Sequence, residues 1–303
     1  MTGLEVTVGS LALRNPVMPA SGTFEYHPDS PPPFDVNHLG AIVPKSLTLY
    51  PQLGNRPSRL AETPSGLINS IGIPSLGLER FLAEVLPRYE GLTAPVMVSV
   101  AGYSPQEYLT LTEKLSAVSL VAGIELNLSC PNLDQHRMPA QDVGLLRESV
   151  KSARSVTDKP LWAKLSLEVT SIVEMAQACL ESGADAVTLI NTFRAMAIDS
   201  QQRRVILGNG TGGLSGPAIR PMALAAVWDV SHAVDIPVIG VGGITTVDDA
   251  LMFLLAGASA IQIGTASFRQ PLTMVRVIEG LTGHLAKLGV ASIAEIIGAG
   301  HLS

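Results

Sequence analysis

The sequence has little cysteine and no recognisable metal-binding motif. Its 303 residues include two cysteines, Cys130 and Cys179, and the six histidines are scattered along the chain. Two cysteines cannot form a disulfide framework, and no CxxC motif or Cys/His cluster points to zinc. We therefore expect no bound metal and a reducing, cytoplasmic setting.

The chain also has little charge and no basic excess. Charged residues make up 15% of it, hydrophobic residues 47%, and the formal net charge is −6, which argues against a nucleic-acid-binding surface. The first residues, MTGLEVTVGS, do not resemble a signal peptide. The uncharged stretch 250–268 is long enough to cross a membrane, but Gly257, Gln262 and Gly264 interrupt it. A helix, a turn and a buried strand fit it better, so we expect no membrane span.

A repeated pattern runs along the chain: a short apolar run, a break, then a helical period. The runs mostly lack clean alternation, which is typical of strands buried on both faces of a parallel sheet. The clearest helix is predicted at 170–185, with Met175 and Cys179 on its apolar face. The pattern predicts a (β/α)8 TIM barrel with one domain over residues 1–303; a doubly wound sheet fits less well because the glycine-rich elements come late. The eight runs are 16–20, 40–45, 95–100, 123–128, 160–165, 185–190, 237–242 and 259–264.

Polar residues or glycines follow or end the predicted strands, where barrel enzymes carry their active sites. We expect these residues to converge on one mouth. The glycines of "GVGGI" and "IGTA" would let the backbone approach a phosphate closely, although turn formation alone would also explain them. The residues are Ser21, Lys45, Ser46, Ser99, Asn127, Lys164, Asn191, Thr192, Gly242, Gly243, Gly264 and Thr265.

Two lysines lie within apolar strands, where an unpaired ammonium is costly to bury. Lys45 and Lys164 therefore suggest an anionic ligand at the mouth. The alternative is a buried ion pair with an acid such as Glu62 or Glu125.

Amides and one thiol complete the candidate set. Asn69, Asn127, Asn132 and Asn191 suit a planar ring that both donates and accepts hydrogen bonds, although each alone could simply form a turn. Cys130, in the loop "NLSCPN", is a candidate base near two cations, or else a small buried hydrophobe.

Several motifs together resemble the class 1 dihydroorotate dehydrogenases. "PASGTF", "INSIGI", "NLSCPN", "LINTFRAMAID", "TGGLSGPAI", "GVGGI" and "IGTA" occur in order from about residue 15 to 270. "TGGLSGPAI" and "NTFRAMAID" are most similar to class 1B, whose catalytic subunit pairs with an iron–sulfur, FAD-containing subunit. The resemblance implies oxidation of (S)-dihydroorotate to orotate in pyrimidine synthesis, a homodimer, a heterotetramer with that partner, and NAD+ as final acceptor.

The resemblance also implies the site residues. Cys130 would be the general base, removing a proton from C5 while hydride passes from C6 to the N5 atom of FMN. The residues implied for FMN are Ser21, Lys45, Ser46, Ser99, Asn127, Lys164, Ile190, Gly216, Gly242, Gly243, Gly264 and Thr265. The residues implied for the substrate are Lys45, Asn69, Ile71, Gly72, Ile73, Asn127, Asn132, Asn191 and Thr192.

Two departures from the family pattern and several alternatives stand beside this interpretation. The family often has Asn where Ser99 lies, and the loop after Asn132, "LDQHRMPAQD", differs from the usual glycine-containing stretch. The alternatives are a flavin barrel acting on another pyrimidine, a stand-alone dehydrogenase using fumarate or another soluble acceptor, a non-redox phosphate-binding barrel, and an inactive FMN-binding subunit. The last fits poorly with the presence of Lys45, Asn127, Cys130 and Lys164 together.

Overall fold

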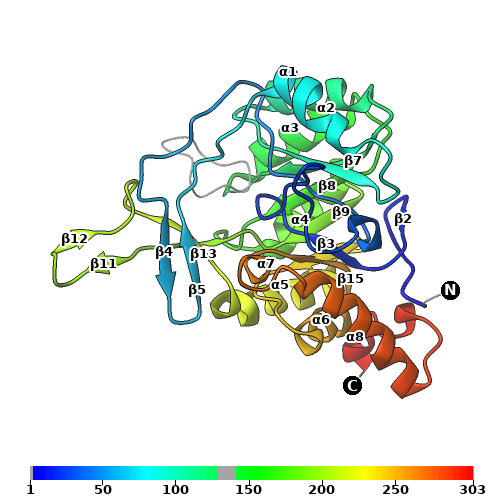
Figure 1. Ribbon diagram of the computed structural model, residues 1–303. Helices are drawn as coiled ribbons and strands as arrows, with labels where there is room; N and C mark the ends of the chain where they lie inside the picture. The colour runs from blue at the N-terminus through cyan, green and yellow to red at the C-terminus, as the bar shows by residue number, and fades with distance from the viewer. Residues whose placement is uncertain (1–2, 129–140, 303) are drawn as a thin grey trace.

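A computed structural model describes residues 3–128 and 141–302 of the chain. Its main feature is a curved sheet of seven parallel strands in the order β3-β15-β14-β9-β8-β7-β6 (Figure 1). Each strand lies within two residues of a predicted run, which confirms the barrel architecture. The strands are β3 (Val17–Pro19), β6 (Val96–Val100), β7 (Val121–Asn127), β8 (Leu161–Leu165), β9 (Ala186–Leu189), β14 (Val238–Val241) and β15 (Ala258–Ile263).

The prediction of a regular strand over 40–45 is wrong. The segment nevertheless bridges β3 and β6 and so closes the barrel. The Gly40 amide donates to the Val17 carbonyl of β3 at 2.8 Å, and the Leu47 amide donates to the Ser99 carbonyl of β6 at 2.8 Å. Only isolated bridges form here. Pro44 lies in the segment and has no N–H to give to a continuous ladder, which explains the irregular pairing.

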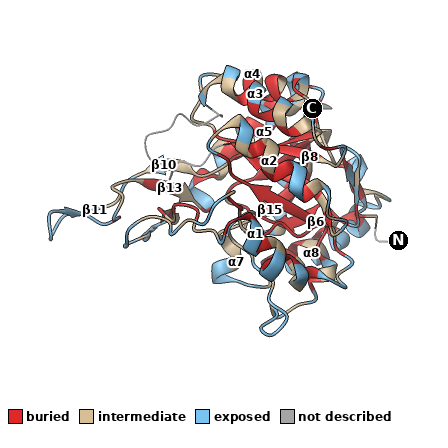
Figure 2. Cartoon of the chain, turned by 90° about the horizontal axis from the view of Figure 1, so that it is seen from above, coloured by how far each residue is buried: buried red, intermediate tan, exposed pale blue. Residues whose placement is uncertain are grey.

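The strands are buried on both faces, as their continuous apolar runs predict. All residues of β6 and β8 are buried, and Met97 and Trp162 are fully covered. Figure 2 shows the buried strands at the centre, with exposed residues on the outer sides of the helices. The surrounding helices are α2 (Pro105–Ser116), α3 (Val143–Arg154), α4 (Ile172–Glu181), α5 (Arg220–Ala233), α6 (Val247–Leu255) and α8 (Thr273–Leu288).

Two predictions about local structure are confirmed. The helix predicted at 170–185 is α4, with Met175 and Cys179 buried, so Cys179 is a core residue. The apolar stretch 250–268 divides into the end of α6, the strand β15 and the short helix α7 (Ala266–Arg269). Within the described part of the chain, no helix has both the length and the hydropathy needed to cross a membrane.

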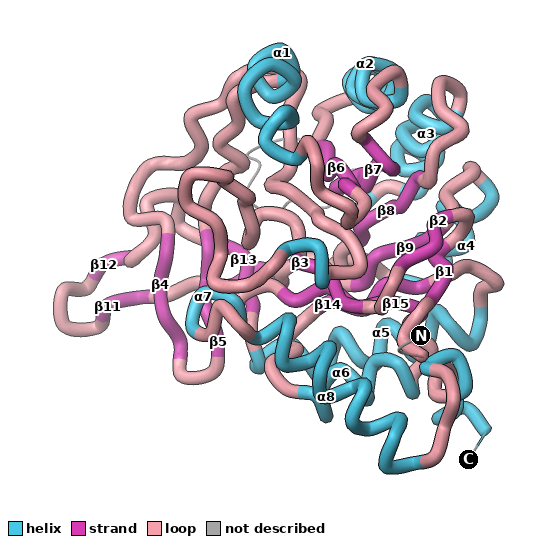
Figure 3. The backbone as a smooth tube through the Cα atoms, turned by 45° about the vertical axis from the view of Figure 1, so that its right-hand side comes forward, coloured by secondary structure: helices cyan, strands magenta, loops and turns pink. Residues whose placement is uncertain are grey.

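A second sheet, which sequence reasoning did not predict, lies beside the barrel mouth. It is antiparallel, in the order β10-β13-β5-β4, and we call it the lid sheet. The β11–β12 hairpin projects beyond it (Figures 1 and 3). The bounds are β4 (Leu60–Thr63), β5 (Gly66–Asn69), β10 (Phe193–Ala195), β11 (Ile198–Asp199), β12 (Arg204–Val205) and β13 (Gly212–Ser215).

Short elements complete the fold. The hairpin formed by β1 and β2 buries Val8 and Leu13 in the main core. These elements are β1 (Val6–Val8), β2 (Leu11–Leu13), η1 (Val36–His38), α1 (Leu78–Arg80), η2 (Phe81–Val85), η3 (Leu86–Tyr89), η5 (Pro217–Ile219), η6 (Ile293–Glu295) and η7 (Ala299–Leu302).

Candidate active site

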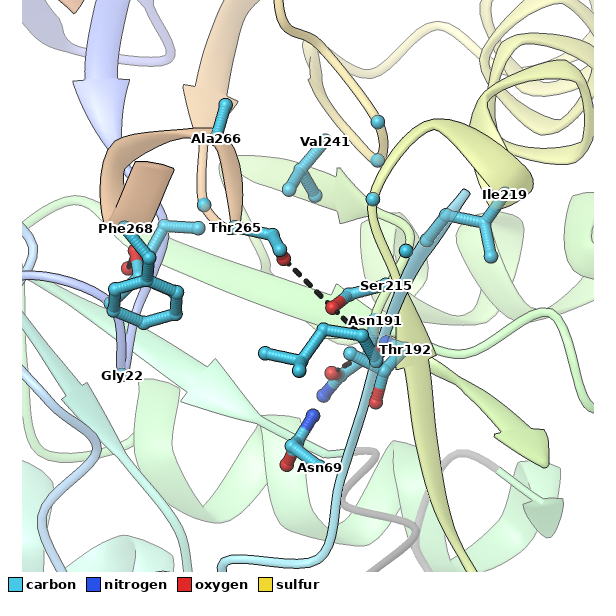
Figure 4. Close-up of a pocket in the computed structure, with 18 of the residues that line it drawn as sticks. Gly22, Asn69, Asn191, Thr192, Ser215, Ile219, Val241, Thr265, Ala266 and Phe268 are labelled. Atoms are coloured by element: carbon cyan, nitrogen blue, oxygen red, sulfur yellow. Dashed lines mark hydrogen bonds between the residues drawn. The ribbon is translucent and has the colours of Figure 1, made fainter. Parts of the chain in front are cut away.

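A large pocket opens where the carboxyl ends of the barrel strands meet the lid sheet. Its volume is about 1060 Å³, large enough for a cofactor and a small substrate together. Figure 4 shows side chains from both walls: Asn69 of the lid sheet lies near Asn191 and Thr192, which follow β9. The barrel ends and the lid sheet therefore form one site from segments far apart in sequence.

The structure brings nearly all of the predicted site residues to this pocket. Ser99 is the exception among the described ones: it is fully buried behind Ser46, with the two hydroxyl oxygens 2.9 Å apart. Cys130 and Asn132 lie outside the described residues. The predicted residues that line the pocket are Ser21, Lys45, Ser46, Asn69, Ile71, Gly72, Ile73, Asn127, Lys164, Ile190, Asn191, Thr192, Gly216, Gly242, Gly243, Gly264 and Thr265.

Backbone forms one end of the pocket, at the ends of β14 and β15. Gly243 has a φ of 72°, and a Cβ there would come within 2.7 Å of the Gly216 carbonyl oxygen. A Cβ at Gly264 would contact Ala20 and Thr23 at 3.4 Å, so this glycine packs against the loop after β3. The Thr265 hydroxyl donates to Ser215 at 2.7 Å (Figure 4). Exposed backbone and hydroxyls at this end suit a phosphate.

A chain of hydrogen bonds fixes the amides of the pocket floor. The Asn127 amide nitrogen donates to the Ser46 hydroxyl at 3.1 Å, and the Asn191 amide nitrogen donates to Asn127 Oδ1 at 3.2 Å. The Tyr108 hydroxyl donates to the Asn127 carbonyl at 2.8 Å. Ser99 contacts the Ser46 hydroxyl on the side away from the pocket, so it helps to hold this series of hydrogen bonds in place. The amides thus have defined orientations before any ligand binds.

Lys164 is the buried cation of the pocket wall. Strand pairing sets it beside Asn127, and its side chain is 5% exposed. Its Nζ donates to Gln262 Oε1 at 3.0 Å and to the Ser21 hydroxyl at 3.3 Å, and lies 3.9 Å from Glu125 Oε1. Burial lowers the pKa of the Lys164 ammonium, and the Glu125 carboxylate opposes that shift. Lys164 therefore combines both interpretations of the sequence, since it lines the pocket and faces a buried acid.

Sequence reasoning missed several residues of the site. Thr63, Ser215, Phe268 and Arg269 also line the pocket. In the sequence, Gln262 stands out only as a polar break in an apolar stretch. Asn69 was the lid-sheet residue singled out as a candidate; the strands themselves were not predicted, because short antiparallel strands become visible only once they pair.

The site has the donors expected for a phosphorylated planar ligand. Glycine backbone lies at one end, fixed amides at the floor and a cation in the wall. This arrangement can bind a flavin phosphate and face its ring with polar groups. Among residues 3–128 and 141–302, no group of three or more His, Cys, Asp or Glu side chains is placed to bind a metal ion.

Comparison with known proteins identifies the family. The family model described as dihydroorotate dehydrogenase matches residues 3–285. The chain is 48% identical over 297 residues to the catalytic subunit of dihydroorotate dehydrogenase B (NAD(+)) of Geotalea uraniireducens, covering 98% of this chain and 97% of that protein. It is 48% identical over 299 residues to the protein of the same name from Thermodesulfovibrio yellowstonii, covering 98% of this chain and 99% of that one.

A solved structure supports the fold. The crystal structure of a dihydroorotate dehydrogenase from Eimeria tenella in complex with ferulenol superposes with a TM-score of 0.81 at 24% identity, covering all of this chain and 90% of that one. The family is flavin-dependent, in keeping with the pocket. With a family model over most of its length and relatives near half identical across nearly all of it, the chain belongs to the dihydroorotate dehydrogenases and is an oxidoreductase.

Proposed function

We propose that this protein is the catalytic subunit of a dihydroorotate dehydrogenase that oxidises (S)-dihydroorotate to orotate in pyrimidine synthesis. The observation that carries the proposal is the gathering of two lysines and three asparagines in one pocket of a chain with this family membership. In the reaction, dihydroorotate loses a proton from C5 and a hydride from C6, and a C5–C6 double bond forms. The two electrons leave with the hydride.

FMN is the proposed cofactor, and when bound it supplies the hydride acceptor. The glycine backbone of Gly243 and Gly264 lines the end of the pocket proposed for its phosphate. Lys164 would stabilise negative charge on the ring, since it is a cation fixed in a water-poor wall. The stretch GNGTGG, 208–213, matches G-x-G-x-x-G but runs into the strand β13 instead of opening a helix, so it does not have the context of a dinucleotide-binding fingerprint.

Substrate binding is proposed at the floor and the lid. Asn69, Asn127 and Asn191 present amides that match the alternating carbonyl and N–H groups of a pyrimidine, and Lys45 would bind its carboxylate. Cys130 is proposed as the base that takes the C5 proton. In support, β7 ends at Asn127, which lines the pocket, and Cys130 is three residues further along the sequence. The remaining proposed substrate contacts are Ile71, Gly72, Ile73, Asn132 and Thr192.

The partners follow from the relatives' name, catalytic subunit, which implies an electron-transfer subunit. We propose that the subunit carries iron–sulfur and FAD groups and passes electrons to NAD+, in a cytoplasmic heterotetramer. A homodimer would be its centre. In support, the projecting hairpin exposes Ile198 at 62% and Val205 at 41%, an apolar surface suited to a second copy of this chain. The single-domain organisation over 1–303 stays a prediction.

Steady-state assays with defined acceptors test the proposal. The purified chain is expected to reduce no NAD+ with dihydroorotate, and to do so once an iron–sulfur, FAD-containing subunit is added. Turnover of the isolated chain with fumarate at a comparable rate would instead support the stand-alone alternative. Oxidation of another dihydropyrimidine in preference to dihydroorotate would change the substrate assignment.

A further inference from the structure

A buried polar cluster lies inside the barrel, beneath the pocket wall. Glu125 of β7 is fully buried, and its Oε2 accepts from Gln262 Nε2 at 2.6 Å and from the Thr188 hydroxyl at 3.1 Å. Its other oxygen, Oε1, accepts no hydrogen bond from any described residue and lies 3.9 Å from Lys164 Nζ. Gln262 also accepts from Lys164 Nζ at 3.0 Å, so its amide links the acid to the cation.

Four strands contribute to this arrangement. Glu125, Lys164, Thr188 and Gln262 come from β7, β8, β9 and β15, and pairing sets Lys164 opposite Thr188. A carboxylate taken fully out of water is costly unless it interacts with a cation or donors, and the cation here also lines the pocket. The cluster is therefore continuous with the active site rather than a separate packing feature.

We propose that Glu125 is a positioning residue that acts through Gln262 and Lys164: it keeps the Lys164 ammonium protonated and directed at the flavin site. Glu125 is not among the described residues that line the pocket. Its negative charge offsets the desolvation of Lys164, and Gln262 holds the Nζ atom in place. A protonated Lys164 can then stabilise negative charge on a reduced cofactor without a proton having to arrive from solvent. This inference rests on the proposed function.

The charged surroundings of Lys164 make Glu125 the decisive group. The other titratable side chains that line the described pocket are Lys45, Glu62 and Arg269, of which Glu62 and Arg269 are exposed. Lys45 is a second cation, so it cannot supply the negative charge that keeps Lys164 protonated. Ser21, in the loop after β3, also accepts a hydrogen bond from Lys164 and carries no charge. Removing the Glu125 charge should therefore lower the pH at which Lys164 loses its proton.

The test is a side-chain NMR titration of Lys164 in the flavin-free full chain. The chain has six lysines, so the Lys164 signal can be assigned by its absence in Lys164→Met. In Glu125→Gln the midpoint is expected to fall by about one pH unit or more relative to the unsubstituted chain. FMN affinity, measured by fluorescence titration across pH, should weaken in Glu125→Gln at a correspondingly lower pH.

Thr188→Val is the matched control, because it removes a hydrogen bond to the same carboxylate and keeps its charge. It should lower thermal stability and leave the Lys164 midpoint nearly unchanged. If Glu125→Gln does not fold, Gln262→Met serves, since it removes the hydrogen-bond acceptor of the ammonium and should also lower the midpoint.

The inference would be overturned if the Lys164 midpoint were unchanged in folded Glu125→Gln or, where that variant does not fold, in Gln262→Met. Equal shifts in Glu125→Gln and Thr188→Val would also overturn it. A chain that binds no flavin would refute the proposed function alone, because the titration of Lys164 would still report the effect of Glu125.

Discussion

At the scale of single residues, Lys164 connects the site to the barrel interior. We expect Lys164→Ala to purify with little flavin and to bind FMN about tenfold more weakly or worse, because a charge-assisted contact is lost. Flavin content is measured from the visible spectrum, and affinity by titration of the apoprotein. Lys287→Ala is the control, since Lys287 is an exposed lysine of α8. Full flavin occupancy in Lys164→Ala would count against the proposed contact.

Cys130 is the residue on which the proposed chemistry depends. Cys130→Ala should retain FMN and lose turnover by about a hundredfold or more, the range of a missing general base. Cys130→Ser should keep some activity, rising with pH, because a hydroxyl is a poorer base than a thiolate. Stopped-flow reduction of the flavin by dihydroorotate measures this step directly. Cys179→Ala is a useful comparison: burial raises the pKa of the Cys179 thiol, and this substitution should affect stability without affecting the chemistry.

At the scale of elements, the start of α6 fixes the loop that carries Gly242 and Gly243. Thr246 caps the helix, and the Asp249 carboxylate accepts from the amides of Thr245 and Thr246 at 2.9 and 3.0 Å and pairs with Arg220 at 2.5 Å. Burial alone would raise the pKa of Asp249, but the hydrogen bonds from Thr245 and Thr246 outweigh it and hold that pKa below its ordinary value.

Asp249→Asn should therefore lower the free energy of unfolding by about 1–2 kcal/mol at neutral pH. A carboxyl group with a depressed pKa stabilises the folded state above its unfolded pKa, and that contribution disappears as the pH falls through the lower, folded value. The difference between wild type and Asp249→Asn, measured by urea unfolding, should thus shrink below about pH 4. A difference that stays constant down to about pH 2 would show that the carboxylate charge is not responsible.

The elements also show how far sequence reasoning reaches. The parallel strands were predictable because strands buried on both faces consist of continuous runs of apolar residues. Their polar ends were predictable too, since barrel geometry gathers residues such as Asn127 and Lys164 at one mouth. The lid sheet was not, because its pairing is non-local and strands such as β13, Gly212–Ser215, have no apolar pattern. For the same reason Gln262 looked like a polar interruption, although it links Glu125 to Lys164.

At the scale of the whole molecule, a closed barrel supplies a rigid frame, and the lid sheet completes one pocket on it. The family membership agrees with the flavin-binding function that the pocket suggests. Glu125, inside the barrel, lies 3.9 Å from Lys164, which lines the pocket. The barrel interior and the active site therefore interact electrostatically through this pair.

The most direct test of the central claim is an anaerobic half-reaction on the purified chain alone. Its visible spectrum is recorded, dihydroorotate is added, and the flavin band is followed. We predict a yellow protein whose band bleaches on addition of the substrate, which would show cofactor, substrate and hydride transfer in one experiment. A protein that stays colourless after reconstitution with FMN would contradict the account, and a yellow protein that dihydroorotate cannot bleach would contradict the substrate assignment.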